Sequence, residues 1–246
     1  MRVLPYEPGR RARLTALWAG RLTRTSVMAG VRPLGLPAAV PGPLRFDGWI
    51  AGLGTTSGTR LVLGHWPASP FGGFSDVMVE RPDGHRLLLA PTPETARFVA
   101  RTYVFDEVRV VPVRVRVGED GWAVDAGALL RLRFALGRRG LTGLLLRAVP
   151  GALAARPAWT AVTDPAARLL MGVRTRGSAV GDRREFYGAR DLRPVTAVTA
   201  RFEGRDLGML ATVVPPVRFG FGSTPRRPSL VRVTTTVLAA PEDPAR

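Results

Sequence analysis

Apolar and polar residues alternate along much of the chain beyond residue 43, which is the pattern of strands that bury one face. In residues 108–117 valines alternate with arginines, and Pro112 predicts an edge position or a bulge there. In residues 129–136 leucines and a phenylalanine alternate with arginines. The same pattern, bounded by glycines and prolines, predicts shorter strands at residues 44–53, 59–66, 75–81, 85–89, 122–124, 195–202, 217–221 and 230–238.

A hairpin is predicted where Asp83-Gly84 separates two of these strands. Asp-Gly is the preferred pair for a two-residue type I′ turn, in which both central residues have positive φ. That register sets Pro82 opposite His85, and a register shifted by one residue would move His85 to the other face. With the two-residue turn, one face of the ribbon carries Asp76, Glu80 and His85.

Helices are predicted in two places. Thr92 as N-cap and Pro93 at the first helical position predict a helix that runs to Tyr103. Residues 141–171 predict two or three short helices interrupted by prolines. The polar residues 172–192 predict a loop with a short strand near Phe186 and Tyr187.

About ten short strands, three or four helices and two early hairpins predict an α+β, strand-rich fold. We expect an antiparallel sheet curled into a barrel or cone, with a few flanking helices. The predicted organisation is a basic N-terminal helix and proline-rich linker over residues 1–43, a single β-rich domain over residues 44–240 and a tail over residues 241–246.

The N-terminal segment has leucines and a tryptophan at helical spacing among arginines in residues 10–25, which predicts a basic amphipathic helix. Such a helix either contacts nucleic acid or an anionic membrane, or packs its apolar stripe on the domain. Packing is the commoner outcome.

The composition is strongly basic, with 36 basic and 19 acidic residues and a net charge of +17. Every basic residue is arginine, and lysine, asparagine, glutamine and cysteine are missing. These absences are typical of a GC-rich coding sequence, which explains the arginine excess better than a dedicated polyanion site does. The charge still favours non-specific contact with nucleic acid or anionic membrane.

The missing residue types exclude whole classes of chemistry. Without cysteine there is no disulfide, thiolate nucleophile, cysteine-bound zinc or iron–sulfur cluster. Without lysine there is no Schiff-base nucleophile, no lysine-bound pyridoxal cofactor and no Walker P-loop. We therefore expect no cofactor. No apolar run reaches the ~18 residues of a membrane span, and Arg21 and Arg24 interrupt a possible signal peptide, so a cytoplasmic protein is expected.

The imidazoles of His65 and His85 lead the candidates for catalysis. An acid/base site would combine one of them with Asp76 or Glu80. A metal site with these carboxylates has no supporting ligand spacing, so no metal is expected. No Gly-x-Ser-x-Gly elbow points to a serine nucleophile.

The strand arginines and Trp66 are the candidates for ligand binding. In a barrel with a polar interior, the arginines would line a pocket for a carboxylate or phosphate. In an ordinary half-buried sheet they face solvent, which fits the valines of the opposite face better. The arginines concerned are Arg114, Arg116, Arg131 and Arg133.

Four stretches resemble uncharacterised proteins of high-GC actinobacteria: residues 46–49 (FDGW), 64–67 (GHWP), 76–85 (DVMVERPDGH) and 216–223 (PVRFGFGS). The strand-and-turn rhythm is also similar to that of acetoacetate-decarboxylase-like cones. The activity of that family depends on a Schiff-base lysine, so the resemblance implies a fold and not that chemistry.

Three hypotheses of function follow. The first is a β-barrel-like domain that binds a small molecule, which would be anionic if the strand arginines line its pocket. The second is an acid/base enzyme that uses His85 or His65 with Asp76 or Glu80. The third is a basic module that contacts nucleic acid or an anionic membrane.

Overall fold

The computed structural model describes residues 43–154, 159, 176–178, 184–220 and 224–238, all within one unit of the chain, Val40–Arg246. The predictions for residues 1–42 and for the tail lie outside the described residues. Along the chain the elements are β1 (Leu44–Thr55), β2 (Arg60–Ala68), β3 (Phe74–Glu80), β4 (Arg86–Ala90), α1 (Pro93–Ala100), β5 (Glu107–Val110), β6 (Arg114–Val117), β7 (Gly121–Ala126), β8 (Leu130–Leu136), α2 (Leu141–Arg147), α3 (Gly151–Ala154), β9 (Arg176–Ser178), β10 (Arg184–Phe202), β11 (Arg205–Asp206), β12 (Leu210–Ala211) and β13 (Ser229–Leu238).

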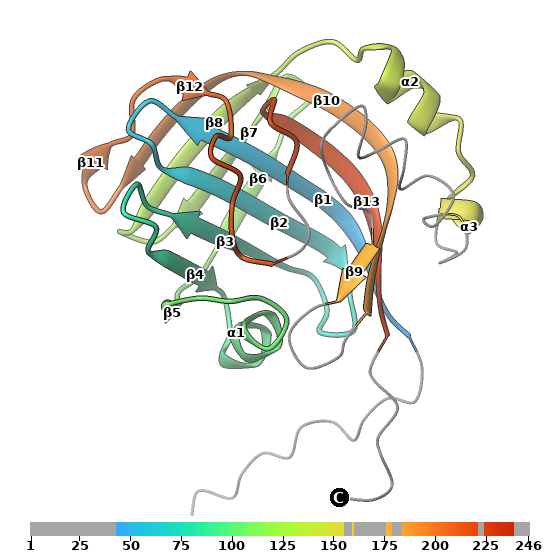
Figure 1. Cartoon of the computed structure of the whole chain (residues 1–246), viewed down its shortest axis with the longest axis horizontal. Coiled ribbons are helices and arrows are strands. Elements are labelled where there is room, and N and C mark those ends of the chain that lie inside the picture. Colours follow the sequence, from blue (N-terminus) through green and yellow to red (C-terminus); the bar gives the residue numbers. More distant parts are fainter. Residues whose placement is uncertain (1–42, 155–158, 160–175, 179–183, 221–223, 239–246) are drawn as a thin grey trace, which may run out of the picture. The chain divides into compact units, whose positions relative to one another are not determined.

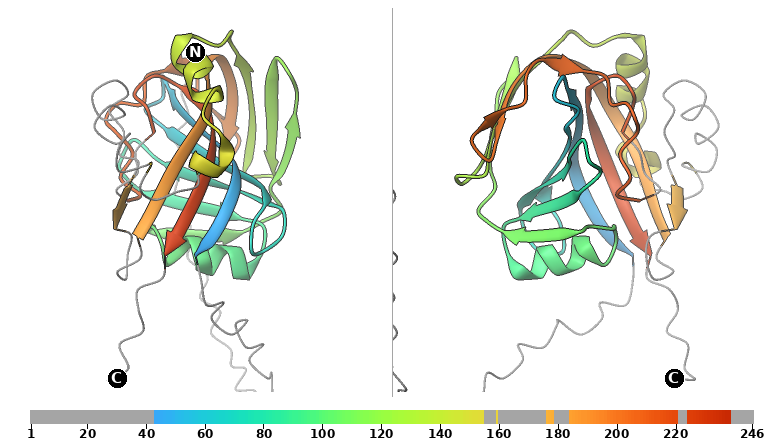
Figure 2. Two further views of the ribbon diagram at one scale, coloured as in Figure 1. Left: turned by 90° about the vertical axis from the view of Figure 1, so that its right-hand side faces the viewer. Right: turned by 60° about the vertical axis from the view of Figure 1, so that its left-hand side comes forward.

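The strands form one sheet in the order β5-β4-β3-β2-β1-β13-β10-β8-β7-β6, with β9 and β11 added to β10 and β12 added to β1. All pairs are antiparallel except β4 with β5, which α1 connects as a crossover helix. The sheet curls so that β1 to β4 face β7 and β8, and the helices lie outside it (Figures 1 and 2). The α+β, strand-rich, curled sheet expected from the alternation is confirmed.

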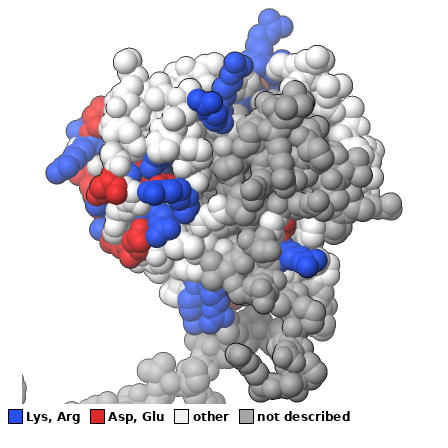
Figure 3. Space-filling view, viewed as in Figure 1, with Lys and Arg blue, Asp and Glu red and all other residues white. Residues whose placement is uncertain are grey.

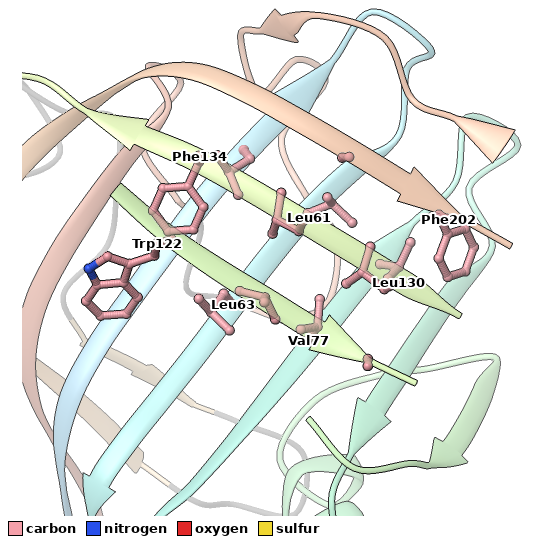
Figure 4. Close-up of a cluster of buried hydrophobic side chains, with 14 of the residues drawn as sticks. Leu61, Leu63, Val77, Trp122, Leu130, Phe134 and Phe202 are labelled. Carbon is pink, nitrogen blue, oxygen red and sulfur yellow. The ribbon is translucent and has the colours of Figure 1, made fainter. Parts of the chain in front are cut away.

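The interior of the curl is filled by the side chains that the alternation predicted to be buried. In β8 the leucines and Phe134 are buried while Arg131 and Arg133 are exposed. Leu61, Leu63 and Val77 from one side of the sheet face residues of β7, β8 and β10 on the other (Figure 4). Burial of this apolar surface is the main force that holds the two sides of the curl together.

The predicted strand at residues 108–117 is divided at Pro112. β5 pairs with β4 and β6 pairs with β7, so two consecutive strands stand at opposite ends of the sheet order. Proline has no N–H to donate to a ladder, so the chain leaves one strand there and joins another. Residues 111–113 thereby connect the two ends of the sheet.

The register predicted for the β3–β4 hairpin is wrong by one residue. Glu80 pairs with Arg86, and the loop closes through Gly84 N–H to Arg81 O at 2.9 Å and Arg81 N–H to His85 O at 2.9 Å. This is a three-residue loop in which Gly84 has φ of +90°. A two-residue loop would pair Pro82 with His85, and proline has no N–H for that pair. His85 consequently leaves the face that Asp76 and Glu80 share.

Two further predictions differ from the structure. β10 begins at Arg184, inside the segment predicted as a loop with only a short strand near Phe186 and Tyr187. It pairs with β13 over residues 184–194 and with β8 over residues 195–202. Residues 217–220 are not a strand; Val217 and Phe219 pack instead on the outer side of the sheet, in a cluster with Val62 and Val213.

Candidate functional site

The outer side of the sheet, opposite the interior core, carries a cavity of about 150 Å³. Its floor consists of residues at alternate positions of β1, β2, β3, β13 and β10, and residues of α1 and of the segment around Phe219 also line it. The lining is mostly apolar. The polar side chains among the described lining residues are Trp66, Asp76, Tyr103, Glu185, Tyr187, Thr224, Ser229 and Thr235.

Asp76 is one of the two buried carboxyl residues of this cavity, with a fractional exposure of 2%. It lies on β3 and pairs across the sheet with Gly64 of β2. A Cβ at Gly64 would lie 2.6 Å from Asp76 Oδ1 and 2.7 Å from Trp66 Nε1. The missing side chain therefore leaves room for Trp66 Nε1–H to donate to Asp76 Oδ1, at 3.2 Å.

The other carboxyl oxygen, Asp76 Oδ2, is buried and accepts no hydrogen bond. Burial raises the pKa of Asp76 to about 7, because desolvation disfavours the charged form, and the hydrogen bond from Trp66 opposes this rise. Near neutral pH the carboxyl group therefore populates both protonation states, and one of its oxygens is buried without a hydrogen-bond partner.

A second polar group of the cavity is a cluster of Tyr103, Tyr187 and Glu185. The hydroxyls of both tyrosines donate to Glu185 Oε2 at 2.9 Å, and the two hydroxyl oxygens are also in contact. Burial, followed by the charge of Glu185, raises the pKa of each tyrosine well above its ordinary value. The charge of Asp76 adds a smaller rise to the pKa of Tyr187.

Unsatisfied hydroxyl groups complete the lining. In the described part of the chain, five buried side-chain N or O atoms lack a hydrogen-bond partner, and Arg60 Nε is the one outside the cavity. The four that belong to cavity-lining residues are Asp76 Oδ2, Thr224 Oγ1, Ser229 Oγ and Thr235 Oγ1.

Glu80 shares the face of Asp76, as predicted, but its carboxylate is fully occupied. It forms ion pairs with Arg60 Nη2 and Arg218 Nε, both at 3.0 Å, and accepts the backbone N–H of Arg218 at 2.8 Å. Its exposure is 0%, and it does not line the cavity. Glu80 therefore has a structural role, since it connects β3 to the segment that contains Arg218.

The two histidines lie outside the cavity lining. His85 is partly exposed, and its Nε2 contacts Glu107 Oε2 at 3.2 Å. His65 Nδ1 contacts Ser75 Oγ at 2.8 Å, its ring packs against Trp49 and Trp122, and burial lowers its pKa. The predicted grouping of a histidine with Asp76 and Glu80 is not found, and a catalytic role for either histidine stays a prediction.

The predicted ligand-binding residues separate into two groups. Trp66 lines the cavity. The four strand arginines are all exposed and do not line it, in agreement with the solvent-facing alternative of the two weighed for them. Arg116 and Arg133 border a shallow groove elsewhere on the sheet. A ligand role for them stays a prediction. These four are Arg114, Arg116, Arg131 and Arg133.

Much of the described surface charge is paired. Arg81 and Arg109 both contact Glu203, and Arg86 contacts Asp106. Basic and acidic side chains lie next to one another at the left of the view in Figure 3. Among the described residues, no group of three or more metal-ligating side chains is suitable for an ion, and no helix is long and apolar enough to cross a membrane.

The sequence reasoning missed the tyrosine cluster. The sequence predicts a short strand near Phe186 and Tyr187, but the surrounding charges indicate a loop on both sides of it. Tyr103 was expected only to pack its helix on the sheet. Its position 82 residues before Glu185 left no local signal of their contact.

Comparisons with known proteins give a resemblance at low identity. The chain is similar to the crystal structure of acetoacetate decarboxylase from Legionella pneumophila, with 11% identity and a TM-score of 0.40 over 89% of this chain and 96% of that chain. A second solved structure of acetoacetate decarboxylase gives 8% identity and a TM-score of 0.41 over 80% and 87% of the two chains. The predicted similarity to acetoacetate-decarboxylase-like structures is thus confirmed. No protein-family model and no curated protein matches the sequence.

Proposed function

We propose that the chain binds a small, largely apolar molecule with a hydrogen-bonding head group in the cavity beside Asp76. The observation that carries this proposal is the gathering of unsatisfied polar atoms. Buried polar groups in native proteins almost always have a hydrogen-bond partner, and each exception requires an explanation. Four such atoms around one cavity are explained together by one ligand that contacts several of them.

The shape and chemistry of the cavity support the same proposal. Ligand sites are concave, mostly apolar and equipped with a few convergent polar groups. Phe46, Val231 and Phe219 are among the apolar lining residues, and Asp76 is a titratable group with a shifted pKa in the same space.

Native mass spectrometry of the purified protein tests the proposal. We expect a retained small molecule whose mass disappears in Val231→Phe, which enlarges a side chain on the cavity floor. The matched control is Val117→Phe, at a position that is 58% exposed and outside the cavity. Equal retention by both variants would place the ligand elsewhere. The absence of any retained molecule, together with no stabilisation by a library of small apolar compounds, would contradict the proposal.

A second candidate function is an acid/base enzyme in which Asp76, and not a histidine, transfers the proton. One observation favours it: a carboxyl group with a pKa of about 7 lines a mostly apolar cavity and has one oxygen without a hydrogen-bond partner. A catalytic acid or base works best when its pKa is near the operating pH. Deuterium incorporation from D2O into cyclohexanone would test it. We expect incorporation with the wild type and none with Asp76→Asn, and equal rates would exclude this role.

A further inference from the structure

The described lining of the cavity contains acidic side chains although the chain is strongly basic. The chain has a net charge of +17, yet the described cavity lining includes the carboxyl groups of Asp76 and Glu185 and no arginine or histidine. An anionic ligand would bring its charge close to the carboxyl group of Asp76, at a cost that grows as the surroundings lose water. The described lining therefore disfavours the anionic ligand that the arginines suggested.

The wall beside Asp76 is aromatic. Trp66, which donates to Asp76, packs edge-on against Phe46 at 5.8 Å between ring centroids, and Phe98 stacks on Phe46 at 5.2 Å. Tyr103 and Tyr187 also line the cavity. The faces of aromatic rings carry negative electrostatic potential and attract ammonium groups, most strongly where water is excluded.

The third feature of the cavity is the oxygen of Asp76 that has no hydrogen-bond donor. Asp76 Oδ2 is a buried acceptor without a donor, while Oδ1 is held by Trp66. An ammonium group offers three N–H donors and a positive charge, so it satisfies the oxygen and favours the ionised carboxylate. The unsatisfied hydroxyls of Thr224, Ser229 and Thr235 also accept from N–H donors.

We propose that the ligand of this cavity is an aliphatic amine, bound as its cation with the ammonium group against Asp76 Oδ2 and its apolar body among the aromatic and aliphatic lining residues. This inference rests on the proposed function and specifies the ligand class of the same site. Binding of the amine also changes the number of protons bound to the protein. Near pH 7 part of the Asp76 side chains are protonated in the free protein, so binding of a cation, which favours the ionised carboxylate, releases protons.

Three probes of similar size and different charge test this inference: cyclohexylamine, cyclohexanol and cyclohexanecarboxylate. We expect the amine to bind at least tenfold more tightly than the alcohol, and the carboxylate to bind more weakly than either. Calorimetry in two buffers of different ionisation enthalpy measures the protons released; we expect release at pH 7 with the amine and none with the alcohol.

Asp76→Asn should reduce the affinity for the amine to that for the alcohol and abolish the proton release. Asp125→Asn, whose carboxyl lies outside the cavity lining, should change neither. Val231→Phe should weaken both the amine and the alcohol.

Tighter binding of the alcohol than of the amine, blocked by Val231→Phe, would overturn the amine inference and leave the proposed function intact. Binding of none of the three probes, together with no retained ligand in native mass spectrometry, would overturn both.

Discussion

Strand β3 carries two buried carboxylates, Asp76 and Glu80, four residues apart on the same face, and they have opposite environments. Glu80 is 0% exposed and bound by two guanidinium groups and a backbone N–H. Asp76 is 2% exposed, accepts one hydrogen bond from a neutral indole and leaves one oxygen unsatisfied in a cavity. Burial of a carboxylate is therefore not by itself a sign of function. The presence or absence of a compensating charge separates the two.

The surroundings explain the difference. At the Glu80 end, Arg60 from β2 and the segment that contains Arg218 close over the carboxylate, and Arg60 also donates to Pro215 O and Arg81 O. At the Asp76 end, Gly64 leaves space over the sheet, and the neighbouring groups are Trp66 and the cavity. The Glu80 end joins the segment that contains Arg218 to the sheet, while the Asp76 end borders the cavity.

Glu80→Gln should produce the largest loss of stability. Removal of one partner of a buried ion pair typically costs about 3–5 kcal/mol, because the other charge remains buried without compensation. The side chain of Arg60 is only 4% exposed and would be left in that condition. Urea unfolding measures the loss. The control is Glu203→Gln, which breaks partly exposed ion pairs and should cost about 1 kcal/mol or less. Equal costs would show that Glu80 is not a structural anchor.

Asp76→Asn should change how stability depends on pH. The pKa of Asp76 is about 7 in the folded protein and 3.8 in the unfolded chain, so the folded state holds the extra proton between these values. Its contribution to the free energy of unfolding is therefore full below about pH 4 and decreases as the pH rises to about 7. The decrease is at most about 4 kcal/mol.

Urea unfolding of the wild type and Asp76→Asn at pH 5, 6, 7 and 8 measures this contribution. The stability of the wild type relative to the variant should decrease steadily up to about pH 7 and then level off. A difference that does not vary with pH would show that the carboxyl group is already ionised, and it would remove the contrast with Glu80.

Tyr103→Phe should cost about 1–2 kcal/mol, because it removes a hydrogen bond to a buried carboxyl group without changing the shape of the side chain. Tyr187→Phe should have a similar cost, since its hydroxyl donates to the same oxygen. The double variant should deviate from the sum of the single effects because the two hydroxyls are in contact. Strict additivity, measured by thermal unfolding, would show that the three groups do not act as one cluster.

The smallest effects are expected from two neighbouring residues of β13. Thr235→Val removes a hydroxyl that has no hydrogen-bond partner, from a residue that lines the cavity. The free energy of unfolding should therefore stay nearly unchanged or increase slightly. Thr234→Val removes a donor to Asp47 and should cost about 1 kcal/mol. A cost for Thr235→Val that equals that of Thr234→Val would mean that the Thr235 hydroxyl is already satisfied in the free protein.

Local sequence predicted a large part of the fold. The alternation in β8 placed Arg131 and Arg133 on the exposed side, and Thr92 and Pro93 gave the start of α1, where Thr92 forms the N-cap. The prediction failed where the backbone chemistry of proline decided the result. Pro82 excluded the two-residue turn, and Pro112 ended one strand and released the chain to the other end of the sheet.

The sequence by itself determined that the chain forms a curled, strand-rich sheet without lysine or cysteine chemistry, and that Asp76 and Glu80 lie on the same face of one strand. These conclusions depend on composition and on a two-residue period, which are local properties of the chain. Only the tertiary structure decided which carboxylate is neutralised. Arg218, one of the partners of Glu80, lies 138 residues away in sequence, and the tyrosine cluster across the cavity from Asp76 joins residues 82 apart. Contacts over such separations depend on how the sheet closes, and no local pattern records them.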